Sequence, residues 1–592
     1  MPGLFIAIGP SRLLKAFEDS IDLSRGNKIL TIKEGPFIVG AQEFDNGSIQ
    51  VMESWGKLLL VHSSKRISED KLKNLLKSYL QGKEIFVHTL YQYLASDFSL
   101  VLCDKEKKKC LIFTDPLGIR KMYYFKTHET IMFSQSLFHI FRTLRNLDIC
   151  STSYVLKAID VKNIHLLLSQ GYIDAPNTLF KKIKTTLPGR LYVVNIDGLL
   201  NVSDSVMEWN LFIHTNSNII QKIHDLIIES IKYHIEGLGN VSILLSGGVD
   251  SSLILSLILK HFSNIQVDAF TTTYEGYSEV EGVNKIAEFL HFSMVHHLKF
   301  PTDPENILKY FIQSVKMLDE PHLKGAFLLR FYALTKIRER GLKVILVGDG
   351  GDEVFYGYWY DYWVFHRDYM RILLSKLHRG ILSYLCSKLP VASRIICDAY
   401  YLNKHDMQNL IKSHFSIDPR LLFYYLNNTE HIYSHMRHNN FIDMVSQYLY
   451  NALTRTDLLT LENYAERMGL TIKFPYLYLP LVRYLSTLPP SYKIVNRITK
   501  FLLKALAIRY HYLPAEIVFA RKSGFNQLSL NTMLGNLILT KYKEILAEFV
   551  DGHPALRNFL NKLFKQINRR NTHSIIQYTG LAIYLNSLIN ET

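Results

Sequence analysis

The stretch VSILLSGGVDSSLILSLI, Val241 to Ile258, constrains the fold more than any other part of the chain. Its apolar start predicts a short buried strand, and the apolar run after Ser251 and Ser252 predicts a helix. Between them, Gly247 and Gly248 predict a tight turn that leaves no side chain between backbone N–H groups and a bound anion. The start of the helix adds a partial positive charge at the same place. The stretch therefore predicts a strand, loop and helix that bind phosphate.

The polar side chains of this loop suit a nucleotide that carries Mg²⁺. Hydroxyls of Ser246, Ser251 and Ser252 can donate to phosphate oxygens. Asp250 would repel a phosphate, but it suits a metal ion that bridges to one. Because no Gly-Lys-Ser/Thr follows, this is not a Walker A loop. SGGVDSS is instead similar to the pyrophosphate loop of enzymes that release PPi from ATP; a serine-rich turn in any α/β protein is the alternative.

The composition indicates a globular chain with more than one domain. Its 592 residues are too many for one core, and 48% hydrophobic with 20% charged residues is ordinary for a globular protein. No apolar run reaches transmembrane length, and the first residues lack a basic segment and a cleavage site. We therefore expect neither a membrane span nor a signal peptide.

The cysteines are scattered, odd in number and without a CxxC pair, which favours a reducing cytoplasm over a zinc ribbon. We expect each to be a small buried hydrophobic residue. They are Cys103, Cys110, Cys150, Cys386 and Cys397.

The net charge of +15 permits contact with nucleic acid or a membrane surface. The basic residues are dispersed, however, and the densest run, Lys105 to Lys109, lies between two apolar segments and predicts a solvated hairpin tip. We therefore expect no membrane and no nucleic-acid partner. A positive chain also suits an enzyme that handles ATP and an acidic substrate.

Two patterns divide the chain. Residues 1–205 alternate short β-type runs with turns, which predicts an α+β domain with mostly antiparallel strands. Residues 215–592 begin with a helix, strand, helix rhythm that predicts a parallel, doubly wound sheet. A helical pattern with aromatic stripes, at about 359–450, predicts a helical insertion whose aromatics pack between helices.

A second glycine loop repeats the logic of the first. In KVILVGDGGDEVFYGY, Val344 to Val347 predict a strand, and GDGGDE follows at its carboxyl end. Ligands of open α/β sheets bind outside the carboxyl ends of the strands, so the two loops are expected to converge. Asp250 and Asp352 would then share one or two Mg²⁺ ions. Alone, GDGGD would be an ordinary surface turn.

SGGVDSS followed by GDGGDEVFYGY resembles the asparagine synthetase family, which includes the β-lactam synthetases. Further similar segments follow in order within about 215–530: FTTTYEGYSEVE, LDEPH, KFPYLYLPLVRYLSTLPPSYKI and FLLKALAIRYHYLPAEIVFARKSGF. Upstream, SDFSLVLCDKEKKKCLIFTDPLGIRKMYYF and TLFKKIKTTLPGRLYVVNIDG are similar to the family's glutaminase-type domain. The resemblance implies an N-terminal Ntn-hydrolase-like antiparallel sandwich. It also implies a C-terminal domain of the adenine nucleotide α-hydrolase-like, PP-loop type with a helical extension.

The resemblance also implies a reaction. A carboxylate attacks the α-phosphorus of ATP, PPi leaves, and an amine attacks the acyl-adenylate. Lys522 would neutralise developing charge, Asp349 would orient ammonia or accept its proton, and Asp250 and Asp352 would hold Mg²⁺. The residues expected to bind ATP or PPi are Leu244, Ser246, Gly247, Gly248, Val249, Asp250, Ser251, Ser252, Thr271, Val347 and Gly348.

The N-terminus departs from the family. The family's glutaminase domain begins Met-Cys-Gly, and the processed cysteine supplies both nucleophile and base. Here Met1-Pro2-Gly3 stands at this position, and proline has no thiol. The family's Asn-Gly-Glu-Ile-Tyr-Asn loop, which holds glutamine, is replaced near GKLLLVHSSKRIS. We expect a glutaminase fold that has lost glutamine hydrolysis.

Other departures concern the acceptor. Asp349 stands where the family often has Glu and β-lactam synthetase has Tyr, which favours asparagine-synthetase-like chemistry. Lys473 replaces an Arg of the family, and this change is not conservative where a fork of two donors is needed. The acceptor acid and the nitrogen donor therefore stay open, beyond a small-molecule acid with ammonia or an amine.

Other functions stay open at this point. They are the same adenylating core on another acid or amine, including a ring closure; a catalytically silent nucleotide-binding scaffold; and a tRNA-modifying pyrophosphate-loop enzyme. A homodimer and a separate ammonia-supplying protein are also open. ATP and Mg²⁺ are the cofactors that the pattern implies.

Overall fold

The structure is a computed structural model, which describes most of the chain. Pro2, Lys522, the expected helical insertion at about 359–450, Cys150, Cys386 and Cys397 lie outside the described residues. The described residues are 3–21, 28–34, 37–43, 48–149, 151–195, 200–202, 218–274, 279–323, 326–358, 453–495, 498–520, 527–550, 553–564 and 572–591.

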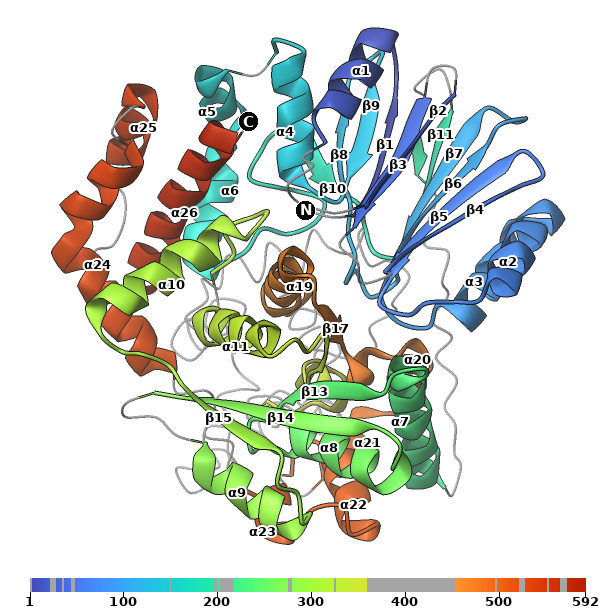
Figure 1. Cartoon of the computed structure of the whole chain (residues 1–592), viewed down its shortest axis with the longest axis vertical. Helices are drawn as coiled ribbons and strands as arrows, with labels where there is room; N and C mark the ends of the chain where they lie inside the picture. Colours follow the sequence, from blue (N-terminus) through green and yellow to red (C-terminus); the bar gives the residue numbers. More distant parts are fainter. Residues whose placement is uncertain are drawn as a thin grey trace, which may run out of the picture.

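Two antiparallel sheets of six strands form the N-terminal part (Figure 1). The first runs, in spatial order, β10 (Ile183–Thr185), β8 (Tyr123–Lys126), β9 (Ile131–Ser134), β1 (Gly3–Ile8), β3 (Phe37–Glu43) and β2 (Lys28–Glu34). The second runs β12 (Leu200–Val202), β11 (Leu191–Asn195), β7 (Lys109–Thr114), β6 (Phe98–Asp104), β5 (Lys57–Ser63) and β4 (Ile49–Ser54). The expected antiparallel sandwich is confirmed.

Strand β5 shows why the sequence forms layers. Successive side chains of a strand point to opposite faces of the sheet. Leu58 and Leu60 belong to the core between the two sheets, whereas Leu59 and Val61 face a separate core with α2 (Glu69–Gln81) and α3 (Lys83–Tyr93). Both faces of the strand are buried, which accounts for its continuous apolar run.

The strands β6 and β7 form the expected hairpin, with the basic run at its turn. Cys103 and Cys110 face each other across the two strands, are both buried, and form a disulfide. The prediction that each cysteine is a separate hydrophobic residue was therefore wrong for this pair. The register of the hairpin brings them together.

A parallel sheet forms the centre of the second part. Its order is β15 (Val295–Lys299), β14 (Gln266–Thr273), β13 (Asn240–Leu244), β16 (Val344–Leu346) and β17 (Thr471–Lys473), and every neighbouring pair is parallel. The expected parallel sheet in this half is confirmed. Helix α7 (Ile219–Ile235) spans the run of apolar residues IIQKIHDLIIESIKYHI, whose period predicts a helix.

Helices join the two parts. The described helices of the first part are α1 (Ser11–Asp19), α2, α3, α4 (Leu137–Asn146), α5 (Thr152–Ala158) and α6 (Val161–Gln170). Those of the second are α7, α8 (Val249–His261), α9 (Val280–Phe289), α10 (Pro304–Lys316), α11 (Phe327–Glu339), α12 (Gly351–Phe355), α19 (Asp457–Met468), α20 (Leu479–Ser486), α21 (Pro490–Lys493), α22 (Phe501–Arg509), α23 (Ala515–Val518), α24 (Gln527–Val550), α25 (Pro554–Phe564) and α26 (Thr572–Glu591). The last helix packs against the first part, where the rings of Tyr584 and Phe138 meet edge to face. Helix α19 lies between the sandwich and the parallel sheet (Figure 1).

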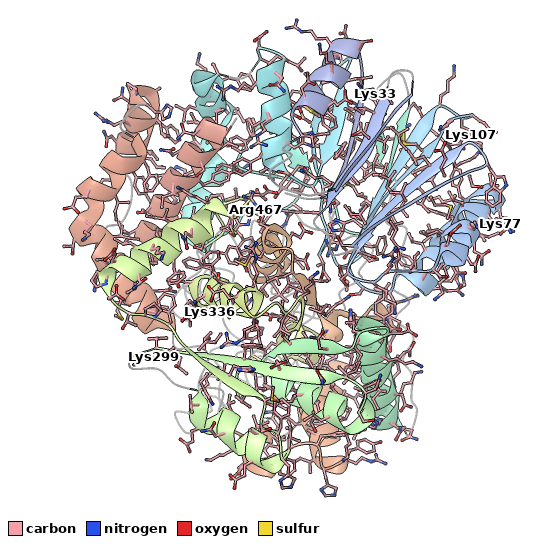
Figure 2. All side chains as sticks on the ribbon, in the orientation of Figure 1. Lys33, Lys77, Lys107, Lys299, Lys336 and Arg467 are labelled. Carbon is pink, nitrogen blue, oxygen red and sulfur yellow. A yellow bond between two sulfur atoms is a disulfide. The ribbon has the colours of Figure 1, made fainter. Side chains whose placement is uncertain are left out.

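Figure 2 places Lys33, Lys77 and Lys107 at the outer edge of the molecule, well separated, and Arg467 near its centre. Within the described ranges, no helix is both long enough and apolar enough to cross a membrane.

Candidate active site

The first glycine loop joins strand β13 to helix α8. Gly247 has a φ of +71°, a left-handed conformation that glycine adopts without strain. Helix α8 begins at Val249, and the backbone N–H of Ser246 donates to Ser251 Oγ over 3.1 Å. Ser252 Oγ is buried and has no hydrogen-bond partner among the described residues. The loop therefore has the expected strand, turn and helix, with a buried hydroxyl left for a ligand.

The second glycine loop lies directly against the first. The two loops follow β13 and β16, which pair side by side. A Cβ added to Gly348 would lie 3.0 Å from the backbone nitrogen of Ser251 and 3.2 Å from Asp250 Cβ. A Cβ on Gly351 would lie 2.6 Å from Asp250 Oδ1. The loops approach so closely that these positions need glycine, and they converge as the sequence predicts.

A lysine that the sequence analysis missed joins the two acidic residues of these loops. Lys500 Nζ contacts Asp250 Oδ2 and lies 2.7 Å from Asp352 Oδ1. Its side chain is only 4% exposed. Burial alone would lower the pKa of Lys500, but attraction to the two carboxylates outweighs it and raises the pKa. The resemblance to the family segment was drawn from Phe501 onward, one residue too late to include this lysine.

The carboxylates around Lys500 fit Mg²⁺. The ammonium group of Lys500 pairs with both Asp250 and Asp352, so the two carboxylates are close enough to share one cation. The buried Asp250 Oδ1 has no hydrogen-bond partner in the described part of the chain. Magnesium prefers hard oxygen donors and is often held by one or two carboxylates together with water and substrate phosphates. Among the described residues, no group of three or more His, Cys, Asp or Glu side chains could hold a metal by itself. Phosphate oxygens would therefore have to complete such a site.

Asp349 is held by an arginine that the sequence analysis also missed. Arg330 of α11 donates from NH2 to Asp349 Oδ1 over 2.7 Å, and its NH1 lies 3.3 Å from Asp457 Oδ1 at the start of α19. Burial would lower the pKa of Arg330, but the two carboxylates raise it. Asp349 therefore forms an ion pair with Arg330 beside the loops. No local sequence pattern indicates this ion pair.

The remaining nucleotide-site candidates lie on the same edge of the sheet. Thr271 is buried on β14, and its Oγ1 has no hydrogen-bond partner among the residues that the structure describes. Leu244 ends β13, and the backbone N–H of Val347 donates to the carbonyl of Lys473 over 3.1 Å. Lys522 lies outside the described residues, so its role stays a prediction.

Lys473 points away from the loops, into the seam between the two parts. Its ammonium donates to the carbonyl oxygen of Ser64, at the end of β5. Burial lowers the pKa of Lys473 to about 8. The side chain thus contacts the N-terminal sandwich, and its difference from the family's arginine affects this seam.

A buried arginine, Arg120, also lies at this seam. Arg120 Nε donates to Asp97 Oδ2 over 2.6 Å and its NH1 donates to Glu466 Oε1 over 2.6 Å, while NH2 lies 3.3 Å from Glu462 Oε2. The guanidinium also donates to His62 Nε2 over 2.8 Å. Glu462 and Glu466 belong to α19, so this arginine links the two parts of the chain.

His62 is neutral in this arrangement. Its Nδ1 donates to the side-chain oxygen of Gln135 over 2.8 Å while Nε2 accepts from Arg120. Burial, followed by the charge of Arg120, lowers the pKa of His62 to about 3. Ser64, two residues further on, bonds to Asp97 through both its N–H and its hydroxyl. The end of β5 is therefore fully engaged within the protein.

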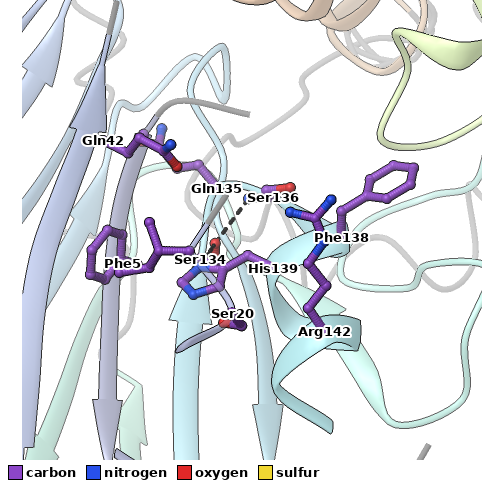
Figure 3. Close-up of a pocket in the computed structure, with 11 residues that line it drawn as sticks. Phe5, Ser20, Gln42, Ser134, Gln135, Ser136, Phe138, His139 and Arg142 are labelled. Atoms are coloured by element: carbon purple, nitrogen blue, oxygen red, sulfur yellow. Dashed lines mark hydrogen bonds between the residues drawn. The ribbon is translucent and has the colours of Figure 1, made fainter. Parts of the chain in front are cut away.

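A small pocket lies elsewhere, between β1, β9 and α4 (Figure 3). Its empty volume is about 340 Å³, including the open mouth. His139 in its wall has both ring nitrogens engaged, Nδ1 with Ser134 Oγ at 3.2 Å and Nε2 with the carbonyl of Phe17 at 3.1 Å. Burial lowers the pKa of His139 to about 4. None of the lining residues belongs to a glycine loop, and they are Gly3, Phe5, Ser20, Ile21, Gln42, Ser134, Gln135, Ser136, Phe138, His139 and Arg142.

The fold and these loops define an α/β protein with a candidate ligand site at the carboxyl edge of a parallel sheet. Residues 222–571, more than half of the chain, match the model of the asparagine synthase family. The chain belongs to this family. Residues 74–203 match a glutamine amidotransferase domain, a range that begins after β5 and leaves the N-terminal residues out.

Curated relatives agree with this assignment. The glutamine-hydrolyzing asparagine synthetase 1 of Bacillus subtilis is 22% identical over 69% of this chain and 64% of its own length. A putative glutamine-hydrolyzing asparagine synthetase 2 of Methanocaldococcus jannaschii is 24% identical over 52% of this chain and 58% of its own length. A putative glutamine-hydrolyzing asparagine synthetase of Mycobacterium tuberculosis is 23% identical over 76% of this chain and 69% of its own length. The chain thus spans less than two thirds of the first two relatives.

Proposed function

We propose that this chain is an ATP-dependent carbon–nitrogen ligase. It activates the carboxylate of an aspartate-like acid as the acyl-adenylate, releases PPi, and transfers the acyl group to ammonia with release of AMP. The observation that carries this proposal is the close contact of two acid-bearing glycine loops at the carboxyl edge of a parallel sheet. There, the ammonium group of Lys500 forms ion pairs with both Asp250 and Asp352.

Different groups of the chain bind the phosphates, compensate charge and orient ammonia. The loop from Ser246 to Ser252 binds the phosphates through hydroxyls and the start of α8, as a PP-loop. Lys500 compensates the charge of Asp250 and Asp352, and Lys522, from its match to the family's segment, would neutralise the charge that develops at the phosphates. Asp250 and Asp352 would hold Mg²⁺ together with the phosphates of ATP, and the ion would supply charge neutralisation there. Asp349 orients ammonia for attack on the activated carbonyl carbon.

We also propose that glutamine is not the nitrogen donor. Pro2 offers no thiol, and the end of β5 supports the same conclusion. There His62 and Ser64 direct their polar atoms to protein partners. An Ntn-like domain at 1–205 would then act as a structural partner of the synthetase domain at 215–592, and the protein would use free or separately supplied ammonia.

The test is release of PPi and AMP from Mg-ATP with aspartate and ammonium, and then with glutamine in place of ammonium. We expect PPi, AMP and asparagine with ammonium only. Amide formed from glutamine would contradict the loss of glutaminase activity. Nucleotide binding without PPi release from aspartate would contradict the substrate assignment, and the same assay would then be run over a set of other acids.

A further inference from the structure

We propose that Arg330 is a positioning residue for the amide-forming step. It holds Asp349 at the place where the incoming amine is oriented. This inference rests on the proposed function and deepens it, because it assigns one half of the reaction to a specific ion pair.

The geometry of the ion pair is fixed from two sides. Arg330 projects from α11, its side chain is 17% exposed, and NH2 reaches Asp349 Oδ1 over 2.7 Å. Its NH1 faces Asp457 at 3.3 Å, and Asp457 is the first residue of α19. A carboxylate at the start of a helix is favoured by the helix dipole. Two helices that pack against each other therefore hold the guanidinium in place.

Asp349 is the part of this cluster that faces the chemistry. It directly follows Gly348, whose backbone adjoins Ser251 and Asp250 of the first loop. Because Arg330 engages Oδ1, we assign Oδ2 to the amine. An aspartate has one rotatable bond fewer than a glutamate, so a single ion pair is enough to set its direction.

Charge supports the same role. Asp250, Asp349, Asp352 and Asp457 gather around a site that must also admit anionic ATP. Arg330 and Lys500 are the cations with ion pairs to these carboxylates among the described residues. A fixed arginine lets Asp349 stay close to the acyl-adenylate without adding an uncompensated negative charge.

The step that depends on this pair is the second half of the reaction. The nitrogen lone pair of ammonia forms a bond to the acyl carbon, the bond from that carbon to the phosphate oxygen breaks, and AMP leaves with the electron pair. The nitrogen loses one proton to solvent. Misplacing a reacting group by about 1 Å can cost about 10²-fold in rate. Activation of the acid precedes this step and does not involve Asp349.

The alternative role for Arg330 is to bind a carboxylate of the acid substrate. The two roles differ in the half-reaction that they affect. A carboxylate ligand would change the concentration of acid needed for acid-dependent exchange of PPi into ATP. A positioning residue would leave this exchange alone and would slow amide formation.

The experiment compares Arg330→Met, Arg330→Lys and Asp457→Asn with the unchanged chain. We expect R330M to keep acid-dependent ATP–PPi exchange within about threefold and to lose about 10²-fold in amide formation from ammonium. R330K should recover part of this loss, and D457N should lose less than R330M because the contact to Asp349 remains. Hydroxylamine, a stronger nucleophile, should reduce the defect of R330M.

The same helix offers a matched control variant for Arg330. Arg338 is exposed on the same helix, so R338M should behave as the unchanged chain in both assays. A raised acid requirement in the exchange assay, or equal loss in both half-reactions, would overturn the positioning role. Absence of exchange in the unchanged chain with every acid would instead contradict the proposed function itself. Thermal unfolding of each variant separates these effects from loss of fold.

Discussion

Helix α19 presents carboxylates to two arginines, one buried and one only partly buried, and the two differ in their surroundings. Arg330 meets Asp457 at the first residue of the helix, beside the glycine loops. Arg120 meets Glu462 and Glu466 further along it, at the seam with the N-terminal sandwich. One helix thus anchors both the candidate site and the contact between the two parts of the chain.

The difference lies in access to ligands. Arg120 is only 4% exposed, and Asp97, Glu466 and His62 accept hydrogen bonds from it inside the protein. Arg330 is 17% exposed and ends on Asp349, which lies beside the loops. A sealed ion pair contributes to the association of the two parts, whereas an accessible one can act on a substrate. This comparison separates a loss of stability from a loss of function in the variants below.

The largest effect on stability is expected for Arg120→Met. Removing one partner from a buried charged cluster costs about 3–5 kcal/mol, because the remaining carboxylates stay buried without compensation. R330M should cost less, about 1–2 kcal/mol, because its partners are partly exposed. The measurement is the midpoint of urea unfolding by circular dichroism. R145M, at an exposed position on α4, is the control, and an equal shift for R120M and R145M would refute the sealed role.

Lys500 is a further buried cation, and it lies between the carboxylates of Asp250 and Asp352. Its side chain is as enclosed as that of Arg120, yet it lies between the two loops and is expected to act on the nucleotide. Lys500→Met should slow acid-dependent ATP–PPi exchange by about 10²–10³-fold, the effect of removing one preorganised charge contact. In contrast to R330M, it should affect the first half of the reaction. R509M, exposed on the following helix, should leave exchange intact, and exchange that survives K500M would remove Lys500 from the site.

Local patterns predicted the loops and most of the elements that carry them. SGGVDSS and GDGGDE have a fixed order of strand, glycine and helix, so their positions follow from neighbouring residues. The ion pairs do not follow in this way. Lys500 and Asp250 are 250 residues apart, and Arg330 meets Asp349 through the tertiary placement of α11, which packs against α19 and β14. Such contacts depend on the tertiary fold and leave no periodic signal in the sequence.

The short strand β10 and the cysteine pair show the same limit at a smaller scale. Three residues are too few to show the alternation that predicts a strand. The sequence indicated the hairpin tip, but the pairing of Cys103 with Cys110 depends on the register of the two strands. With the turn placed correctly, the register could have been derived, so this miss was avoidable. The roles of Lys522 and Pro2 remain predictions.

The acid dependence of the seam is expected to change stability by less than the loss of Arg120 does. Burial and the charge of Arg120 lower the pKa of His62 to about 3, from an ordinary value of 6.5. Between these values the unfolded chain binds a proton that the folded chain does not, so the free energy of unfolding falls as the pH falls. One such histidine contributes about 2 kcal/mol of this loss between pH 7 and pH 5. From pH 7 to pH 5, the free energy of unfolding of the His62→Gln variant should therefore fall by about 2 kcal/mol less than that of the unchanged chain, as measured by urea unfolding at both pH values. His128 is exposed, so H128Q should keep the original dependence, and parallel profiles for H62Q would show that His62 is not held neutral at the seam.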